Sequence, residues 1–252
     1  MPEGTTAQSP GSRSAMFLLG ATLALGFAWS AYMISTAMVR MKQSDVIYVK
    51  GTAETTVKSD WADWGGSLTV RSADLKTGYE ALEKHREAVR QFLSKSLKPE
   101  EFAFSAVEIK EERKKTADGS ETNAIENYVL TQEFSAASAD VLLIGKLSRT
   151  ITDLIKEGIE VSSQRPQYVY KGIEKLKLDL LGKATGNAYE RAKTLASKGG
   201  GEVGALASAS QGVFQITPVN STDVSGGGIY DTSTIEKSVR AVVTLEFRVK
   251  KK

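Results

Sequence analysis

The pattern of hydrophobic and polar positions divides the chain into a short apolar run and a long region of mixed character. The run, residues 16–39, contains 24 residues without a charge and is bracketed by Arg13 and Arg40. A helix of this length reaches about 36 Å, which is enough to cross a hydrocarbon core of about 30 Å with some tilt. We therefore predict that residues 16–39 form a single transmembrane anchor.

Two other interpretations of the apolar run stay open. A secretory signal has an apolar stretch of about 7–15 residues before a small-residue cleavage site. This run is longer, but Ser35-Thr36-Ala37 resembles such a site, so a long signal sequence is one alternative. A helix buried in a soluble core is the other. It is disfavoured because residues 1–15 are rich in Ser, Gly, Pro and Thr, as in a disordered tail. The flanking charges nearly cancel, so they do not decide the orientation in the membrane.

After the anchor the pattern changes to short elements that alternate between a period of two and a period of 3.6. The predicted strands are residues 46–57, 61–71, 102–115, 124–137, 159–170, 203–216 and 237–249. The predicted helices start at Leu75 and end before Pro99, start after a cap at Asp140 and end at Gly158, and cover residues 174–198. A polar, glycine-rich loop over residues 217–235 separates the last two strands.

Within these elements the spacing also predicts which side chains are buried. The core positions are Trp64, Leu68 and Val70 in one strand and Leu176, Leu180, Ala184, Ala188 and Leu195 along the last helix. Strand pairs interleaved with helices predict an α+β fold, with antiparallel sheets and helices packed on one face. We expect two intimately packed α/β subdomains within a folded domain at residues 45–252, plus the one N-terminal transmembrane helix.

The composition excludes some functions. The chain has 33 Lys plus Arg against 30 Asp plus Glu, a formal charge of +3, which is too balanced to predict nucleic-acid binding. There is no cysteine and one histidine, His85, so a zinc site would need several carboxylates, a poor ligand set for that ion. A Ser-His-Asp triad would have to use His85, and the sequence contains no G-x-S-x-G elbow. We predict no catalytic residue, no cofactor and no metal.

Five residues are candidates for interaction instead. Trp61 and Trp64 fall on opposite faces of their strand, which would place one in the core and the other at the surface. An exposed tryptophan could mark an interface, although packing of both in the core is the favoured interpretation. The loop at residues 217–235 is long for a compact domain, and such loops are often functional. Its Asn220, Tyr230 and Asp231 suit protein contacts. We expect a subunit contact there, with a ligand clasp as the alternative.

Several segments together resemble the SIMPL domain over roughly residues 45–250. They are Val46 to Ala53 with Asp60, Asn127-Tyr128, Leu154 to Ile159, Pro166-Gln167-Tyr168 and Ala184 to Ala196. The resemblance implies an extracytoplasmic bacterial envelope protein that enters by a signal peptide or an N-terminal anchor. It also implies links to stress responses, a tendency to self-assemble in some members and no catalytic residues to carry over.

These observations predict a non-catalytic protein that acts through self-association and protein contacts in envelope or stress physiology. Its expected place is the bacterial inner membrane, with a single pass through residues 16–39 and the C-terminal domain in the periplasm. Its expected partners are the membrane, further copies of itself and other envelope proteins, and no nucleic acid. The alternatives are a binding module for a peptide, lipid or small ligand, and an enzyme of unrecognised type.

Overall fold

A computed structural model describes residues 11–42 and 45–251. Helix α1, Gly11–Lys42, contains the predicted anchor, and its stretch Phe17–Met38 is long and apolar enough to span a membrane. None of this stretch is buried within the protein, which disfavours the soluble-core interpretation. The first ten residues of the predicted tail lie outside the described residues, and α1 begins within the tail's last five.

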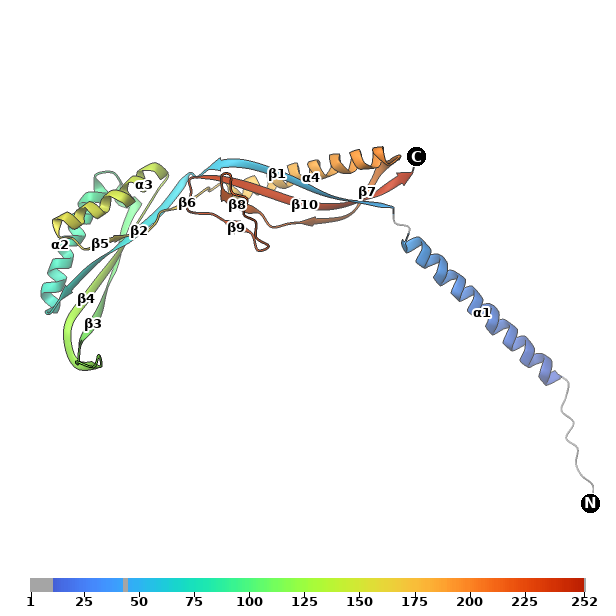
Figure 1. Cartoon of the computed structure of the whole chain (residues 1–252), viewed down its shortest axis with the longest axis horizontal. Helices are drawn as coiled ribbons and strands as arrows, with labels where there is room; N and C mark the ends of the chain where they lie inside the picture. The colour runs from blue at the N-terminus through green and yellow to red at the C-terminus, as the bar shows by residue number, and fades with distance from the viewer. Residues whose placement is uncertain (1–10, 43–44, 252) are drawn as a thin grey trace, which may run out of the picture. The chain divides into compact units, whose positions relative to one another are not determined.

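The remaining elements confirm an α+β fold with two antiparallel-rich sheets (Figure 1). In sheet A the strand order is β1-β10-β8-β9, and β7 also pairs with β10. Its strands are β1 (Val46–Lys58), β7 (Gly201–Gln211), β8 (Gln215–Pro218), β9 (Ile229–Tyr230) and β10 (Glu236–Lys251). Strand β8 runs antiparallel to β10, whereas β9 runs parallel to β8.

In sheet B the order is β3-β4-β2-β5, and β6 pairs with β2 beside β5. Its strands are β2 (Trp61–Ser72), β3 (Phe102–Lys115), β4 (Glu121–Ser138), β5 (Val161–Ser163) and β6 (Gln167–Val169). The helices between them are α2 (Leu75–Ser94), α3 (Val141–Thr150) and the 3-10 turns η1 (Pro99–Glu101) and η2 (Ile151–Glu157). The last helix is α4 (Ile173–Lys198).

Alternation along β2 creates the core of sheet B. Trp64, Leu68 and Val70 are buried, as predicted, and they pack with the buried face of α2 and α3. The carboxylate of Asp74 accepts a hydrogen bond from the Thr77 amide at the start of α2, and Asp140 caps α3 in the same way. One face of the sheet is therefore covered by helices and the other is open.

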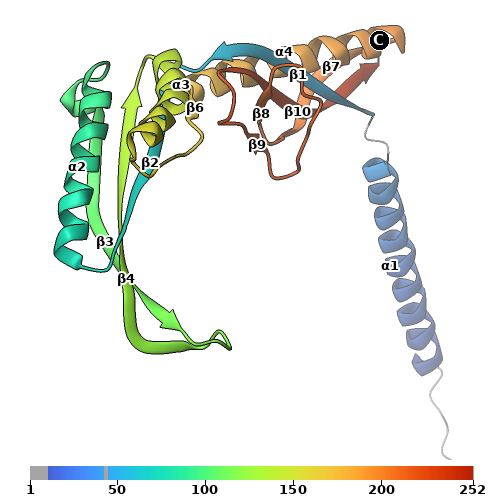
Figure 2. The ribbon, with the colours of Figure 1, turned by 60° about the vertical axis from the view of Figure 1, so that its left-hand side comes forward.

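The far half of the β3–β4 hairpin continues past α2 with no helix over it (Figure 2). Every residue from Glu108 to Lys115 on β3 is exposed. The turn uses Gly119 at a φ of 86°, a left-handed conformation that favours glycine and fits the Asp118-Gly119 signal.

Helix α4 lies very close to β1. A Cβ on Gly51 would lie 2.1 Å from the carbonyl oxygen of Ala184 and 2.6 Å from the Ala188 amide nitrogen, so only glycine fits. The Asn187 side chain accepts a hydrogen bond of 3.2 Å from the Thr52 amide. A helix side of small residues permits this approach.

Three predictions about element boundaries and faces are wrong in detail. Residues 159–170 form two short strands, because Pro166 has no amide hydrogen to continue the pairing with β2. Residues 203–216 likewise divide into β7 and β8, and the loop at 217–235 contains β9. On α4, Leu195 is 55% exposed, since the buried stripe keeps a four-residue step through Ala192 and Ala196.

Candidate interaction surfaces

Trp64 is the core tryptophan of the predicted pair. Its ring packs edge to face on Phe134, with 5.3 Å between centroids. Its Nε1 donates a hydrogen bond of 3.0 Å to Oγ of Ser163, which in turn donates one of 2.7 Å to the Ser148 carbonyl. Trp64 therefore joins β5 and the end of α3 to the sheet, and its indole N–H is already used within the chain.

Trp61 is half-buried on the opposite side of β2. The ammonium of Lys171 lies 3.1 Å from the centroid of its ring, and its Nε1 donates a hydrogen bond of 3.1 Å to Asp63. The same Lys171 donates its backbone amide to Asp60. One face of this ring is already occupied by a cation from the same chain.

Asp231 is the centre of a buried polar turn. Its carboxylate accepts hydrogen bonds from Ser233, Thr234 and the ammonium of Lys237, and the two charged side chains are 8% and 2% exposed. Burial raises the pKa of Asp231, but the hydrogen bonds from Thr234 and Ser233 and the Lys237 charge lower it by more, so its pKa lies well below its ordinary value. Burial lowers the pKa of Lys237, and Asp231 opposes that effect.

The Asp231 turn also closes one side of sheet A. The Asp231 amide donates a hydrogen bond of 2.9 Å to the Ile216 carbonyl, which continues the pairing of β9 along β8. The carboxylate thus holds the chain's own loop in place. Of the other candidates in this loop, Tyr230 is 49% exposed and Asn220 is an exposed residue at a φ of 68°.

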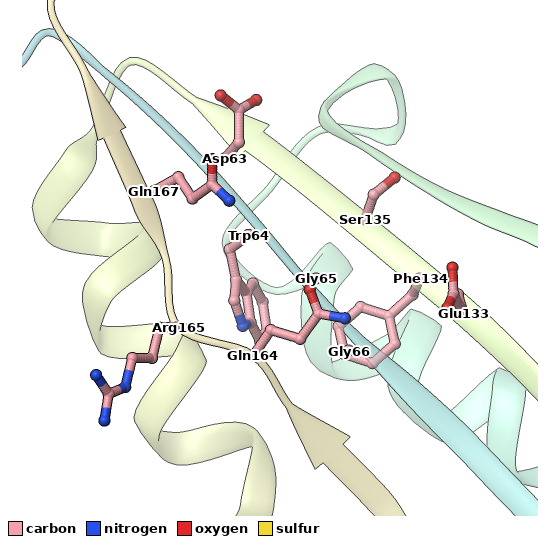
Figure 3. Close-up of a pocket in the computed structure, with 10 residues that line it drawn as sticks. All are labelled: Asp63, Trp64, Gly65, Gly66, Glu133, Phe134, Ser135, Gln164, Arg165 and Gln167. Carbon is pink, nitrogen blue, oxygen red and sulfur yellow. The ribbon is translucent and has the colours of Figure 1, made fainter. Parts of the chain in front are cut away.

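A hollow of about 270 Å³ opens beside β2 at a pair of adjacent glycines (Figure 3). A Cβ on Gly66 would lie 2.1 Å from the Ser162 carbonyl oxygen, and one on Gly65 would lie 2.8 Å from the Phe134 carbonyl oxygen. Its lining residues are Asp63, Trp64, Gly65, Gly66, Glu133, Phe134, Ser135, Gln164, Arg165 and Gln167. The sequence feature that could have predicted this hollow is the pair of adjacent glycines inside a strand, because such glycines mark a close approach of another backbone segment.

The side chains around this hollow are hydrogen-bonding groups without a nucleophile and base pair. In Figure 3 the Arg165 guanidinium extends away from the other labelled side chains, so the acids Asp63 and Glu133 set the charge of the rim. The hollow is also smaller than the usual range of about 300–1,000 Å³ for ligand pockets.

A larger hollow of about 740 Å³ lies over the face of sheet A that points away from α4. Its floor includes Lys50, Glu54 and Arg240. The buried Gln215 holds the covering loop, because its side chain donates to the Ser225 carbonyl at 2.8 Å and accepts from the Ser225 amide at 3.3 Å. Part of the predicted functional loop therefore covers a hollow.

The charges on the floor are largely paired. Glu54 accepts hydrogen bonds from Ser238 and from Arg240, whose Nε lies 2.8 Å away. The hydrogen bond from Ser238, followed by the one from Arg240, lowers the pKa of Glu54.

The edges of the two sheets are the least obvious surfaces from the sequence. At the edge of sheet A, β7 pairs with β10 alone among the described strands. Residues Ala205 to Gln211 are exposed on both faces, and the only charged residue of the strand is Glu202. At the edge of sheet B, β3 carries seven charged residues among its 14 and three register shifts against β4.

Within residues 11–42 and 45–251, no cluster of three or more His, Cys, Asp or Glu could hold a metal ion. His85 is half-buried on α2, where burial lowers its pKa and the nearby Glu160 opposes this.

Comparison with known protein families assigns the chain. Residues 47–247 match the SIMPL family, which is described as a protein of unknown function (DUF541). The match covers most of the chain and nearly all of the folded part, so the chain belongs to the SIMPL family. The resemblance that the sequence motifs indicated is thereby confirmed. The search of curated proteins finds no match.

Proposed function

We propose that this chain is a non-catalytic, single-pass protein of the bacterial inner membrane, whose SIMPL domain acts in the periplasm through self-association and contacts with other envelope proteins. Two findings support the proposal: the apolar helix α1 and membership of the SIMPL family. The extracytoplasmic side and a role in envelope or stress physiology follow from what the family resemblance implies.

The observation that carries self-association is the unprotected edge of β7. An edge strand presents unpaired amide and carbonyl groups, and proteins usually oppose pairing there with lysines, prolines, bulges or a covering helix. From Val203 to Val213 the sequence contains no charge and no proline. Both faces of β7 are exposed over most of this length, so a second strand could approach without steric obstruction.

A second copy of the same strand is the partner that fits best. Antiparallel pairing of β7 with β7 of another copy obeys two-fold symmetry, so each chain satisfies the other's edge at once. The small side chains of Ala205, Ala207 and Ala209 add little bulk to either face of the pair.

The natural absence of cysteine gives a direct test, because one introduced cysteine is the only thiol in the chain. We expect Ala207→Cys to cross-link with a short bis-maleimide between copies of the full chain in native membranes. Lys110→Cys on the charged β3 edge is the matched control and should remain uncross-linked.

A second measurement keeps the test independent of the cross-linker. In detergent micelles, sedimentation equilibrium should give a mass above one protomer for the unmodified chain and a mass of one protomer for Ala205→Lys with Ala207→Lys. A chain that remains monomeric at high concentration and does not cross-link at residue 207 would overturn self-association through β7.

The orientation has its own experiment. A reporter that is active only outside the cytoplasm, fused after Lys252, should give a signal in growing bacteria. A silent reporter, with the fusion protein present in the membrane, would reverse the proposed orientation without affecting the β7 test.

The hollow over sheet A favours the second candidate function, a binding module for a peptide, lipid or small ligand. Its volume of about 740 Å³ lies within the range of ligand pockets, and its wall includes the apolar Val213, Val224 and Val242. A thermal-shift screen should then find compounds that stabilise the unmodified chain but not Val213→Trp, which fills the hollow. Val219→Trp, outside the lining, should retain the response, and a screen without such compounds would remove this candidate.

A further inference from the structure

The length of the chain between α1 and β1 limits how far the start of the domain can lie from the membrane. The apolar stretch ends at Met38, α1 continues to Lys42 and β1 begins at Val46. From Met38 to Val46 the chain takes four helical steps and four further steps, and these eight steps cover at most about 20 Å even when the last four are fully extended. Whatever direction α1 takes, Val46 therefore lies within about 20 Å of the hydrocarbon edge.

Other segments lie at the same end of the domain as Val46. The Val249 amide near the end of β10 donates a hydrogen bond of 2.7 Å to the Asp45 carbonyl. The glycines that join α4 to β7 are also there, since a Cβ on Gly201 would lie 2.7 Å from Cγ1 of Val249. The end of α4, the start of β7 and the end of β10 thus share the membrane-proximal end with the start of β1.

This end contains an apolar hollow of about 490 Å³. It is lined by Asp45, Val46, Ile47, Leu195, Ala196, Gly199, Gly200, Gly201 and Val249. Leu195 is on its wall and is 55% exposed, so an apolar side chain faces solvent where the chain meets the membrane. This exposure is the feature of α4 that the predicted stripe missed.

The net positive charge of the protein is concentrated in the same segments. Residues 39–49, 195–204 and 245–252 contain seven Lys or Arg and three Asp or Glu, a net charge of +4. The whole chain has a formal charge of +3, so all other residues together have a net charge of −1. The described cations Lys198, Arg248 and Lys250 are exposed, and Lys251 and Lys252 follow in the sequence.

We propose that this end, defined as residues 45–47, 195–201 and 248–250, docks on the phosphates of anionic lipid headgroups in the membrane that holds α1. Lys198, Arg248 and Lys250 bind the phosphates, and Leu195 enters the interfacial layer beside them. This inference rests on the proposed membrane anchor. The anchor holds the protein at the bilayer, whereas the docked end would fix which part of the domain touches the lipid.

The test uses the full chain with Leu195→Cys, labelled with an environment-sensitive fluorophore and reconstituted into vesicles. The vesicles are phosphatidylcholine alone or phosphatidylcholine with 30% phosphatidylglycerol, each with a nitroxide-labelled lipid as quencher. We expect at least twofold stronger quenching in the anionic vesicles, and loss of that difference in 0.5 M NaCl because salt screens exposed charges. Leu142→Cys, at 63% exposure on α3, is the matched control and should show no dependence on the lipid.

A charge variant separates docking from anchoring. Changing Lys198, Arg248 and Lys250 to Gln should reduce quenching at position 195 to its value in neutral vesicles, with flotation of the protein on the vesicles unchanged. The control removes three cations elsewhere, with Lys110, Arg113 and Lys114 changed to Gln, and should leave the quenching unaltered.

The possible outcomes are distinct. If the unmodified chain does not float with the vesicles, the membrane anchor itself is wrong. If it floats, but quenching at position 195 is equal in neutral and anionic vesicles or equal to that at position 142, the anchor stands and the docked end is overturned.

Discussion

Strands β3 and β7 both lie at the edge of a sheet, but only β3 carries features that oppose pairing with another chain. Half of the residues of β3 are charged, and its register against β4 shifts at three places. Strand β7 has one charged residue, Glu202, and is otherwise built from small or uncharged side chains. Because neither strand is covered by a helix over its exposed half, the difference lies in the side chains themselves.

Two further edges, those of β1 and β8, are also protected. The edge of β1 is approached by α4, whose Asn187 accepts a hydrogen bond from the Thr52 amide. The edge of β8 is covered by β9 and by the turn that Asp231 holds. The open edge of β7 contrasts with these protected edges, and each of the following changes either removes a protection or tests its strength.

The largest effect is expected at the β8 edge from Asp231→Asn. This change leaves the ammonium of Lys237 buried without a counter-charge, so the free energy of unfolding should fall by about 3–5 kcal/mol. Urea unfolding of the full chain in detergent micelles, followed by circular dichroism, measures it. Asp223→Asn, in the exposed part of the same loop, should change the value by less than about 0.5 kcal/mol.

A double variant checks the cause of that loss. When Lys237→Met accompanies Asp231→Asn, no charge remains buried and most of the lost stability should return. A double variant as unstable as Asp231→Asn alone would contradict the ion-pair explanation.

The next effect is expected where α4 covers β1. Gly51→Ala places a methyl group against the α4 backbone, which must move, and we expect a loss of about 2–3 kcal/mol in the same urea experiment. Gly182→Ala on α4 has no heavy atom within 4 Å of the new Cβ and should instead gain about 0.5–1 kcal/mol. Equal effects of the two changes would show that α4 does not lie this close to β1.

A smaller effect is expected from removing the charges on β3. With Lys110, Glu112 and Lys114 changed to Gln, the β3 edge should begin to associate at least tenfold more tightly, or about 1.4 kcal/mol. The background carries Ala205→Lys and Ala207→Lys, so that β7 does not contribute to the mass measured by sedimentation. The same three substitutions at Lys76, Glu80 and Lys84 on α2 remove equal charge and should leave the mass unchanged.

The smallest effect concerns pH and the link between β1 and β10. Hydrogen bonds from Ser238 and Arg240 lower the pKa of Glu54 in the folded state. The contribution of Glu54 to the free energy of unfolding is therefore complete above the ordinary pKa of 4.5, and it is lost as the pH falls through the lower pKa of the folded state. The pair is nearly half exposed and screened by solvent, so the contribution is below about 1 kcal/mol. Unfolding measured between pH 6 and pH 3 should show a shallower loss for Glu54→Gln than for the unmodified chain.

Periodicity was sufficient to predict the elements that have one clear face. Strand β2 has strict alternation and the predicted core residues Trp64, Leu68 and Val70, and the Asp-Gly pair predicted the long hairpin. Such patterns report burial against the chain's own neighbours. They do not report pairing along an edge, so β7 and β8 appeared as one continuous strand.

The candidate surfaces were harder to predict for a related reason. Asp231 and Tyr230 are adjacent in a polar loop, yet one is buried in an ion pair and the other is half-exposed. The two residues differ because Asp231 lies beside Lys237, which is six residues later in the sequence and belongs to β10. On α4 the leucine at position 195 suggested burial by its chemistry, while the geometry buries the alanines at 192 and 196.

The bare end of the β3–β4 hairpin has a consequence for how the protein opens. Residues 108–115 gain backbone pairing with β4 but bury almost no apolar surface, so little of the global stability protects them. Amide hydrogen exchange should therefore be fast at this end while the β2 amides remain protected. A protease could also cleave between Lys114 and Lys115 and leave the rest of the sheet folded.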